Sequence, residues 1–284
     1  MIPFAWDEPK TLSEAVNLLD PDDPTVRPIA GGTALMLMMK AGVFMPSRLI
    51  SLAKIEPLYS EITIDRAGAV RIGAMASLSK LERSGEAMEA FPLMKRALRT
   101  LSNVRVRNVA CVGGALAHGD PHMDLPPLFA ALGARVSVIG PAGKREIAVE
   151  DLYTGYYETV LQKNELIAEA IVPPLNGARA SYMKITSRSA DDWPALNIGV
   201  RLEKDGTRIR DARIVISAAT EKVTRLSKTE KLLRGASPDD RSLAEAADVA
   251  AGEVSFLSDA HGSAAYKKEL LRVCLKRAIR EALS

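Results

Sequence analysis

The chain has 284 residues, of which 47% are apolar and 26% are charged, and its formal net charge is +3. This length gives room for two or three domains of an ordinary globular protein, and the small charge gives no support for nucleic-acid binding. Two cysteines exclude a disulfide framework, and they exclude an iron–sulfur cluster or a structural zinc held by this chain alone.

The first twelve residues lack the basic and apolar regions of a signal peptide. Uncharged runs such as 28–39 are shorter than the roughly 20 residues that a membrane-spanning helix needs. We therefore expect a cytoplasmic protein without a membrane span.

A small α/β subdomain is predicted over residues 1–57. Thr11 or Ser13 can cap a helix that runs to Leu19. A strand, a Gly-Gly loop, a helix and a second strand are then expected over 27–29, 30–33, 34–41 and 48–52.

A second subdomain is predicted over 58–175. It starts with a hairpin over 61–72 and continues with helices over 78–82 and 93–101. Pro126 and Pro127 can open a further helix that Gly133 ends, since proline suits the first helical turn and glycine the end. Two strands follow, over 135–139 and 146–149.

The third domain is predicted over 178–284, after a linker-like stretch around 173–180. It should hold three antiparallel strands and two helices, over 180–187, 195–203, 212–219, 242–253 and 264–283. The predicted fold class is thus α+β with an antiparallel C-terminal sheet. The last helix is basic on one side, which indicates packing on its own domain or, less simply, docking of an acidic partner. The basic side holds Lys267, Lys268, Arg272, Lys276, Arg277 and Arg280.

Two segments repeat one pattern, residues 29–34 (IAGGTA) and 110–115 (ACVGGA). Glycine lets a ligand approach the main chain closely, and consecutive backbone N–H groups bind phosphate oxygens. The pair predicts a diphosphate held from both sides, although each pair of glycines alone could be a tight turn. No G-x-G-x-x-G follows a strand, so a Rossmann site is unsupported, and no G-x-x-x-x-G-K-[ST] occurs, so a P-loop is excluded.

Residues 118–124 (HGDPHMD) contain two of the three histidines and two aspartates. Such residues are metal ligands, but Gly119 and Pro121 disfavour a helix that would put His118 and His122 on one face. We expect no metal site. Asp124 is predicted to accept a hydrogen bond from a ribose or flavin group.

Residues 184–194 (KITSRSADDWP) could be a solvated hairpin end. A ring as large and apolar as that of Trp193 is not expected in a fully solvated turn, however. Cys111 is either a reactive loop thiol or, more commonly, a small buried residue. A hydrolase is disfavoured because no G-x-S-x-G elbow is present.

Four segments carry a family resemblance, namely 3–19, 30–40, 101–134 and 181–194. Together they make the chain similar to the FAD-binding medium subunit of the molybdenum hydroxylases. That group includes the carbon monoxide dehydrogenase flavoprotein and the flavin domain of xanthine dehydrogenase. The resemblance covers nearly the whole chain, and its most specific part is R-N-x-A-x-x-G-G followed by D-x-P.

The resemblance implies a fold similar to that of vanillyl-alcohol oxidase (PCMH type), with FAD between the two N-terminal subdomains and the C-terminal domain closing over the flavin. It implies cofactor contacts from both Gly-Gly segments, from Asp124 and His118, from the apolar residue Leu166 or Ile167, and from Lys184 and Trp193. The two segments supply Ala30, Gly31, Gly32, Thr33 and Ala34, and Cys111, Val112, Gly113, Gly114 and Ala115.

Three positions depart from the family pattern. Ala34 stands where Ser, Asp or Asn is common, Ala115 where Asn or Ser is, and Cys111 where Thr or Ser is. Each departure removes or weakens a side-chain hydrogen bond, worth about 0.5–1.5 kcal/mol. We therefore expect intact but weaker FAD binding.

The implied function is electron transfer. A large partner would carry molybdopterin and a small partner two [2Fe–2S] clusters, in a dimer of heterotrimers. FAD on this chain would pass electrons to NAD⁺, a quinone, oxygen or another acceptor. No residue of this chain is then named as catalytic. The alternatives are a self-sufficient flavin oxidase or reductase, and a non-catalytic nucleotide-binding protein.

Overall fold

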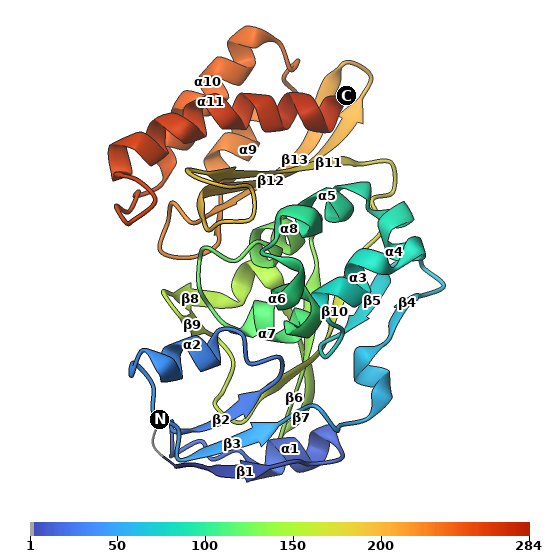
Figure 1. Cartoon of the computed structure of the whole chain (residues 1–284). Coiled ribbons are helices and arrows are strands. Elements are labelled where there is room, and N and C mark those ends of the chain that lie inside the picture. The colour runs from blue at the N-terminus through green and yellow to red at the C-terminus, as the bar shows by residue number, and fades with distance from the viewer. Residues whose placement is uncertain (1–2) are drawn as a thin grey trace.

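The computed structural model describes residues 3–284, which form three layers stacked from the N-terminal to the C-terminal end (Figure 1). The N-terminal layer is a parallel three-stranded sheet of order β1-β3-β2, from Ala5–Asp7, Arg48–Ser51 and Val26–Ile29. Helices α1 (Leu12–Leu18) and α2 (Leu35–Lys40) belong to this layer.

Helix α1 starts at a complete capping box. The Thr11 side chain accepts a hydrogen bond from the Glu14 backbone N–H, at 3.1 Å from nitrogen to oxygen. The Glu14 carboxylate accepts in return from the Thr11 N–H. This reciprocal pairing satisfies two backbone donors that the first turn leaves free. Of the two predicted caps, Thr11 and Ser13, the structure has Thr11.

Thr11→Ala is expected to lower the free energy of unfolding by about 1 kcal/mol, because the alanine side chain cannot accept the Glu14 N–H. Urea unfolding followed by circular dichroism measures the change. Ser13→Ala, two residues further along the chain, is the matched control. Its free energy of unfolding should stay within about 0.5 kcal/mol of the wild-type value. An equal loss in both variants would contradict the capping role.

The middle layer is an antiparallel five-stranded sheet of order β4-β5-β10-β6-β7. Its strands are Ile62–Ile64, Val70–Gly73, Leu166–Val172, Arg135–Gly140 and Gly143–Ala148. The same layer includes two short turns of 3-10 helix, η1 (Pro57–Ser60) and η2 (Val149–Asp151). It also includes a small hairpin of β8 (Tyr153–Gly155) and β9 (Glu158–Thr159).

Six short helices accompany the middle sheet, around a core that includes Phe91, Leu116 and Phe129, and α4 and α7 contact its strands directly. Their bounds are α3 Leu78–Arg83, α4 Gly85–Ala90, α5 Pro92–Thr100, α6 Val104–Val109, α7 Val112–Ala117 and α8 Leu125–Leu132. Gly133 ends α8 in the left-handed conformation, with φ 76°, as its place after the last apolar residue predicts.

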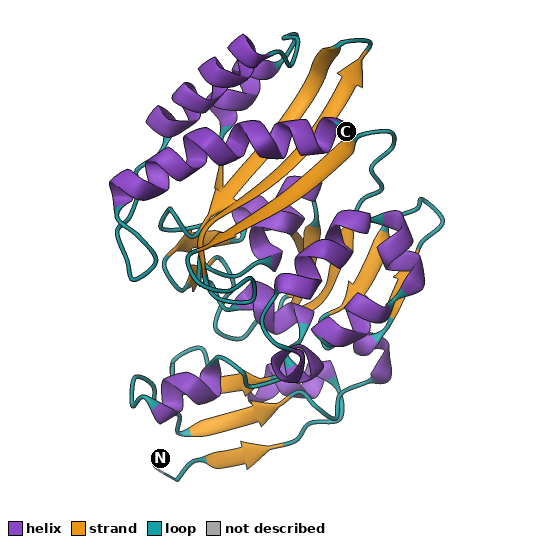
Figure 2. Ribbon diagram, turned by 45° about the horizontal axis from the view of Figure 1, so that its top comes forward, coloured by secondary structure: helices purple, strands orange, loops and turns teal. Residues whose placement is uncertain are grey.

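The C-terminal layer is an antiparallel sheet of order β11-β12-β13-β14, from Arg179–Thr186, Pro194–Asp205, Arg208–Ser217 and Thr224–Arg225. Helix α8 packs on one face, against β12 and β13. Helices α9 (Ser227–Leu233), α10 (Asp240–Glu253) and α11 (Ala264–Leu283) lie with the other face, as Figure 2 shows. The sheet is therefore covered on both sides.

The α+β class, the antiparallel C-terminal sheet and the long C-terminal helices agree with the prediction. The sequence patterns did not reveal β1, β10, α4, α6 or α9. Among the helices of residues 3–284, none is both long and apolar enough to cross a bilayer. The predicted boundary between the two N-terminal subdomains, at residues 57 and 58, stays a prediction. The buried cluster around Leu12 and Ile50 also contains Leu166 of β10, so the two subdomains share a core.

Candidate functional site

The first Gly-Gly segment is a loop between β2 and α2. A Cβ added to Gly31 would lie 1.9 Å from the Val109 carbonyl oxygen, so only glycine allows this contact. Gly32 has φ 68°, which also favours glycine. Within the described chain, the backbone N–H groups of Gly32, Thr33 and Ala34 have no hydrogen-bond acceptor. These amides can therefore bind an external anion.

The second Gly-Gly segment lies inside α7, so the expected loop is a helical turn instead. Gly113 packs on Ala74: its N–H donates to the Ala74 carbonyl at 2.8 Å, and an added Cβ would lie 2.5 Å from the Ala74 Cβ. Gly114 is exposed, and a Cβ added there would have no atom within 4 Å. The two glycines thus differ, because one permits internal packing and the other leaves the surface open.

The two segments meet through Gly31, which lies against the backbone of Val109 and Ala110 directly before α7. The open surface of Gly114 and the free amides of residues 32–34 therefore belong to neighbouring segments. An anion held from both segments stays a prediction.

Three of the second segment's side chains are buried in the protein, namely Cys111, Val112 and Ala115. Burial raises the pKa of the Cys111 thiol, so it stays neutral and resembles a small apolar residue more than a reactive one. Ala115 is part of the main core, where an asparagine would bury its amide. Ala34, which is half-buried at the N-cap of α2, has no side-chain cap. Of the three departures, only Ala34 is at a position that is not buried, where a polar side chain could cap the helix.

Asp124 and Lys184 form a buried pair between the start of α8 and strand β11. The Lys184 Nζ donates to Asp124 Oδ2 at 3.2 Å and to the Thr100 carbonyl at 2.8 Å. The Tyr182 hydroxyl donates to Asp124 Oδ1 at 2.9 Å. Burial raises the pKa of Asp124, and the Lys184 charge opposes that shift. Both carboxylate oxygens already have protein partners, so a cofactor contact of Asp124 stays a prediction.

The segment 118–124 also holds a group that the sequence patterns missed. The ring nitrogens of His122 lie 2.8 Å from Asp120 Oδ1 and 3.0 Å from Asp259 Oδ2. Asp259 is also bound by Lys267, whose side chain is completely buried. Lys267 was expected on the basic face of the last helix, but its Nζ instead donates inward, to the Ala218 carbonyl at 2.9 Å.

Aromatic rings surround His122. The Trp193 ring centroid is 5.8 Å away in a T-shaped arrangement, and the His261 and Tyr156 rings are also in contact with it. Trp193 is half exposed, so the expectation that it is not wholly solvated is confirmed. His118 lies at the end of α7 against Tyr157, and burial lowers its pKa. His261 therefore lies beside His122 although it is far along the chain, and His118, four residues before His122, joins the same group of rings through Tyr157 and Tyr156.

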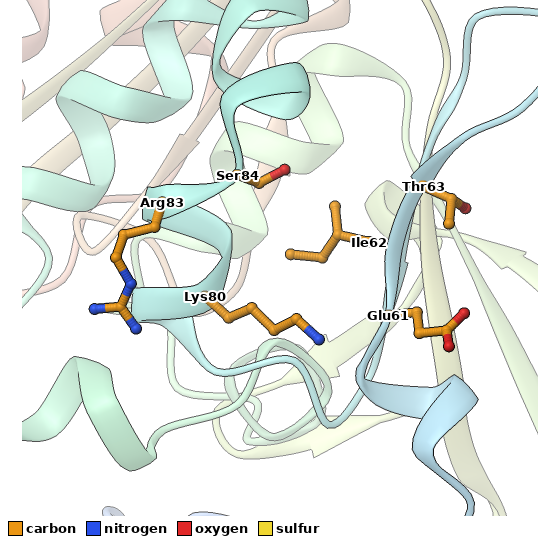
Figure 3. Close-up of a pocket in the computed structure, with 6 residues that line it drawn as sticks. All are labelled: Glu61, Ile62, Thr63, Lys80, Arg83 and Ser84. Atoms are coloured by element: carbon orange, nitrogen blue, oxygen red, sulfur yellow. The ribbon is translucent and has the colours of Figure 1, made fainter.

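The remaining candidates lie elsewhere. Leu166 and Ile167 begin β10 and are buried in two hydrophobic clusters, and a flavin contact of either residue stays a prediction. A hollow of about 430 Å³ lies between β4 and α3–α4 (Figure 3), and none of the predicted residues lines it. A second, of about 490 Å³, lies between β11 and α11 and shares only Lys184 with the prediction. Neither hollow marks the Gly-Gly segments, where free amides are the better indication of a site.

Known proteins match the chain along its whole length. Residues 2–175 match the family described as the FAD-binding domain in molybdopterin dehydrogenase, and residues 181–282 match the CO dehydrogenase flavoprotein C-terminal domain. The nicotine 6-hydroxylase medium subunit of Paenarthrobacter nicotinovorans is 32% identical over 98% of this chain and 96% of its own length. The glyceraldehyde dehydrogenase medium chain of Sulfolobus acidocaldarius is 28% identical over 98% of each chain.

The fold comparison agrees. A solved chain of carbon monoxide dehydrogenase from Hydrogenophaga pseudoflava superposes with a TM-score of 0.94 at 31% identity, over 100% of this chain and 99% of that one. The resemblance stated from the sequence motifs and the fold it implied are thereby confirmed. The chain belongs to the family of FAD-binding medium subunits of the molybdenum-containing dehydrogenases.

Proposed function

We propose that this chain binds FAD through its two Gly-Gly segments and serves as the electron-transfer subunit of a molybdenum hydroxylase complex. The observation that supports this most directly is the contact of Gly31 with Val109 and Ala110, which makes the segment of the free amides 32–34 a neighbour of the segment that holds the open Gly114. A diphosphate needs several convergent N–H donors and close approach to the backbone, and this chain offers both.

The residues present fit such a group. Gly31 brings the two segments together, residues 32–34 would donate backbone N–H groups to the diphosphate, and Gly114 would let it approach α7. When bound, FAD supplies the redox chemistry, while the protein contributes position and electrostatics. Lys184 would place a positive charge near the flavin from β11, held in position by Asp124 and the Thr100 carbonyl.

The partners follow from the relatives, which are medium chains or subunits of larger enzymes. We infer a large subunit with molybdopterin and a small subunit with [2Fe–2S] clusters, assembled as a dimer of heterotrimers in the cytoplasm. Substrate would bind the large subunit, and this chain would receive the electrons and pass them to an external acceptor.

Gly114→Ala is expected to weaken FAD binding about tenfold or more, or ~1.4 kcal/mol, because the new methyl group occupies the surface that the diphosphate approaches. The same change should stabilise the FAD-free protein by about 0.5–1 kcal/mol, since alanine suits a helix interior better and no atom lies within 4 Å. Titration with FAD, followed by flavin fluorescence, and urea unfolding without FAD measure the two effects.

Gly252→Ala is the matched control. Gly252 lies in α10, and a Cβ added there also has no atom within 4 Å. This variant should gain stability without any change in FAD affinity. FAD binding that is unaltered in Gly114→Ala would place the cofactor elsewhere, and a wild-type protein that binds no FAD would overturn the proposed function.

A further inference from the structure

One histidine joins the two halves of the molecule. His122 lies between α7 and α8, and Asp259 lies in the loop before α11, 137 residues further along the chain. The imidazole contacts Asp120 at one ring nitrogen and Asp259 at the other, at 2.8 and 3.0 Å. It is 7% exposed, so solvent competes little for these contacts.

This geometry requires a protonated ring. A neutral imidazole has one N–H, whereas two carboxylates here each face a ring nitrogen and can only accept. Burial opposes the charge on Asp259, but hydrogen bonds from Lys267 and His122 outweigh it and lower the pKa to about 2. Hydrogen bonds likewise outweigh burial and lower the pKa of Asp120. Both carboxylates are therefore ionised, and only an imidazolium can donate to both.

The other groups around His122 come from three elements. The turn between β8 and β9 supplies Tyr156 and Tyr157, and burial raises the pKa of each so that both stay neutral. The Tyr157 hydroxyl donates to Asp120 Oδ2 at 2.8 Å. The loop before α11 supplies His261, and α11 itself supplies Lys267, which is bound to Asp259. The two aspartates thus balance the charges of His122 and Lys267.

Trp193 packs on the same imidazole from the loop before β12, with ring centroids 5.8 Å apart. We call the contacts Asp120–His122–Asp259 the His122 bridge. It therefore holds together the segment 118–124, the Trp193 ring and the loop 258–262.

We propose that His122 is a proton-dependent positioning residue for the flavin site, whose imidazolium holds Trp193 and the loop 258–262 against the FAD-binding half. The inference rests on the proposed function, and it takes the flavin to lie beside Trp193, as the family resemblance implies. His122 acts through Trp193 and through the loop 258–262, and it has no part in the redox chemistry.

The direction in which pH changes FAD binding follows from two opposing effects on the pKa of His122. Burial disfavours its charge, but Asp120 and Asp259 outweigh burial and raise its pKa above the usual 6.5. Both hydrogen bonds of His122 are then present below pH 6.5. They are lost as the pH rises through the higher pKa that His122 has in the folded protein. FAD binding should weaken over the same interval.

The first experiment needs no flavin. The chain has two tryptophans, so Trp6→Phe leaves Trp193 as the only one. An imidazolium in contact quenches indole fluorescence, and we expect the emission to rise in one step between about pH 5 and pH 9. The step should disappear in His122→Gln, remain in the matched control His261→Gln, and move to lower pH in Asp259→Asn. Circular dichroism confirms that each variant is folded.

The second experiment measures the dissociation constant of FAD across the same pH range. In wild type, FAD should bind about fivefold or more weakly above the step than below it. In His122→Gln the affinity should be low throughout and independent of pH. A fluorescence step that persists without His122, or an FAD affinity that is constant across the step, would overturn the inference. A wild-type protein that binds no FAD at any pH while it keeps the fluorescence step would instead overturn the proposed function.

Discussion

Gly31→Ala is expected to lower the free energy of unfolding by about 3 kcal/mol or more and to abolish FAD binding in the same variant. The added Cβ would lie 1.9 Å from the Val109 carbonyl oxygen and 2.9 Å from the Ala110 Cα, so backbone must move apart. No rotamer change can relieve this overlap, because the three nearest atoms all belong to the main chain. Urea unfolding and FAD titration measure the two losses.

The comparison that makes this result informative is Gly114→Ala. Both variants add one methyl group to a Gly-Gly segment, but at Gly114 the space is open. Stability should therefore fall only at Gly31, while FAD affinity falls at both positions. A Gly31→Ala protein that unfolds at the wild-type urea concentration would mean that the two segments do not touch in solution.

Lys184→Met is expected to destabilise the protein by about 3–5 kcal/mol, because it leaves the carboxylate of Asp124 buried without its cation. The Lys184 and Asp124 side chains are 5% and 8% exposed, so water can replace little of the lost interaction. The pKa of Asp124, already raised by burial, should rise further. The loss should then be largest at high pH and shrink as the pH falls through that pKa, since a protonated carboxyl carries no charge. Urea unfolding at several pH values measures this.

The double variant Lys184→Met with Asp124→Asn separates charge from packing. It removes both charges, so most of the stability lost in the single variant should return. Lys54→Met at the exposed Lys54–Glu8 pair is the control and should cost less than about 1 kcal/mol. If the double variant is no more stable than Lys184→Met, the effect arises from the lost aliphatic contacts rather than from the unpaired charge.

Local chemistry made part of this fold predictable. Thr11 with Glu14 marks the start of α1, and Pro126, Pro127 and Gly133 mark both ends of α8, because caps and helix ends depend on residues a few positions apart. Strand β10 was missed for the opposite reason. It is buried between β5 and β6, so its run of apolar residues has no simple alternation.

In the candidate site, too, local features were predictable from the sequence and contacts between distant segments were not. The Gly-Gly pattern identified backbone suited to a diphosphate, but it could not distinguish Gly113, which packs on Ala74, from the open Gly114. The bridge at His122 was out of reach, because its partner Asp259 belongs to a distant loop whose position depends on the whole C-terminal fold. Which residue pairs with which across such distances is decided by tertiary packing, and no short motif records it.

The position of β10 at the centre of the middle sheet has a consequence for synthesis of the chain. Residues 166–172 pair with β5 and β6 and also complete the cluster around α1, so both N-terminal layers remain unfinished until this strand leaves the ribosome. Pairings between residues so far apart also slow folding. Nascent chains that end before residue 166 should therefore stay sensitive to protease and rely on chaperones, whereas chains that extend well beyond residue 172 can close both cores together.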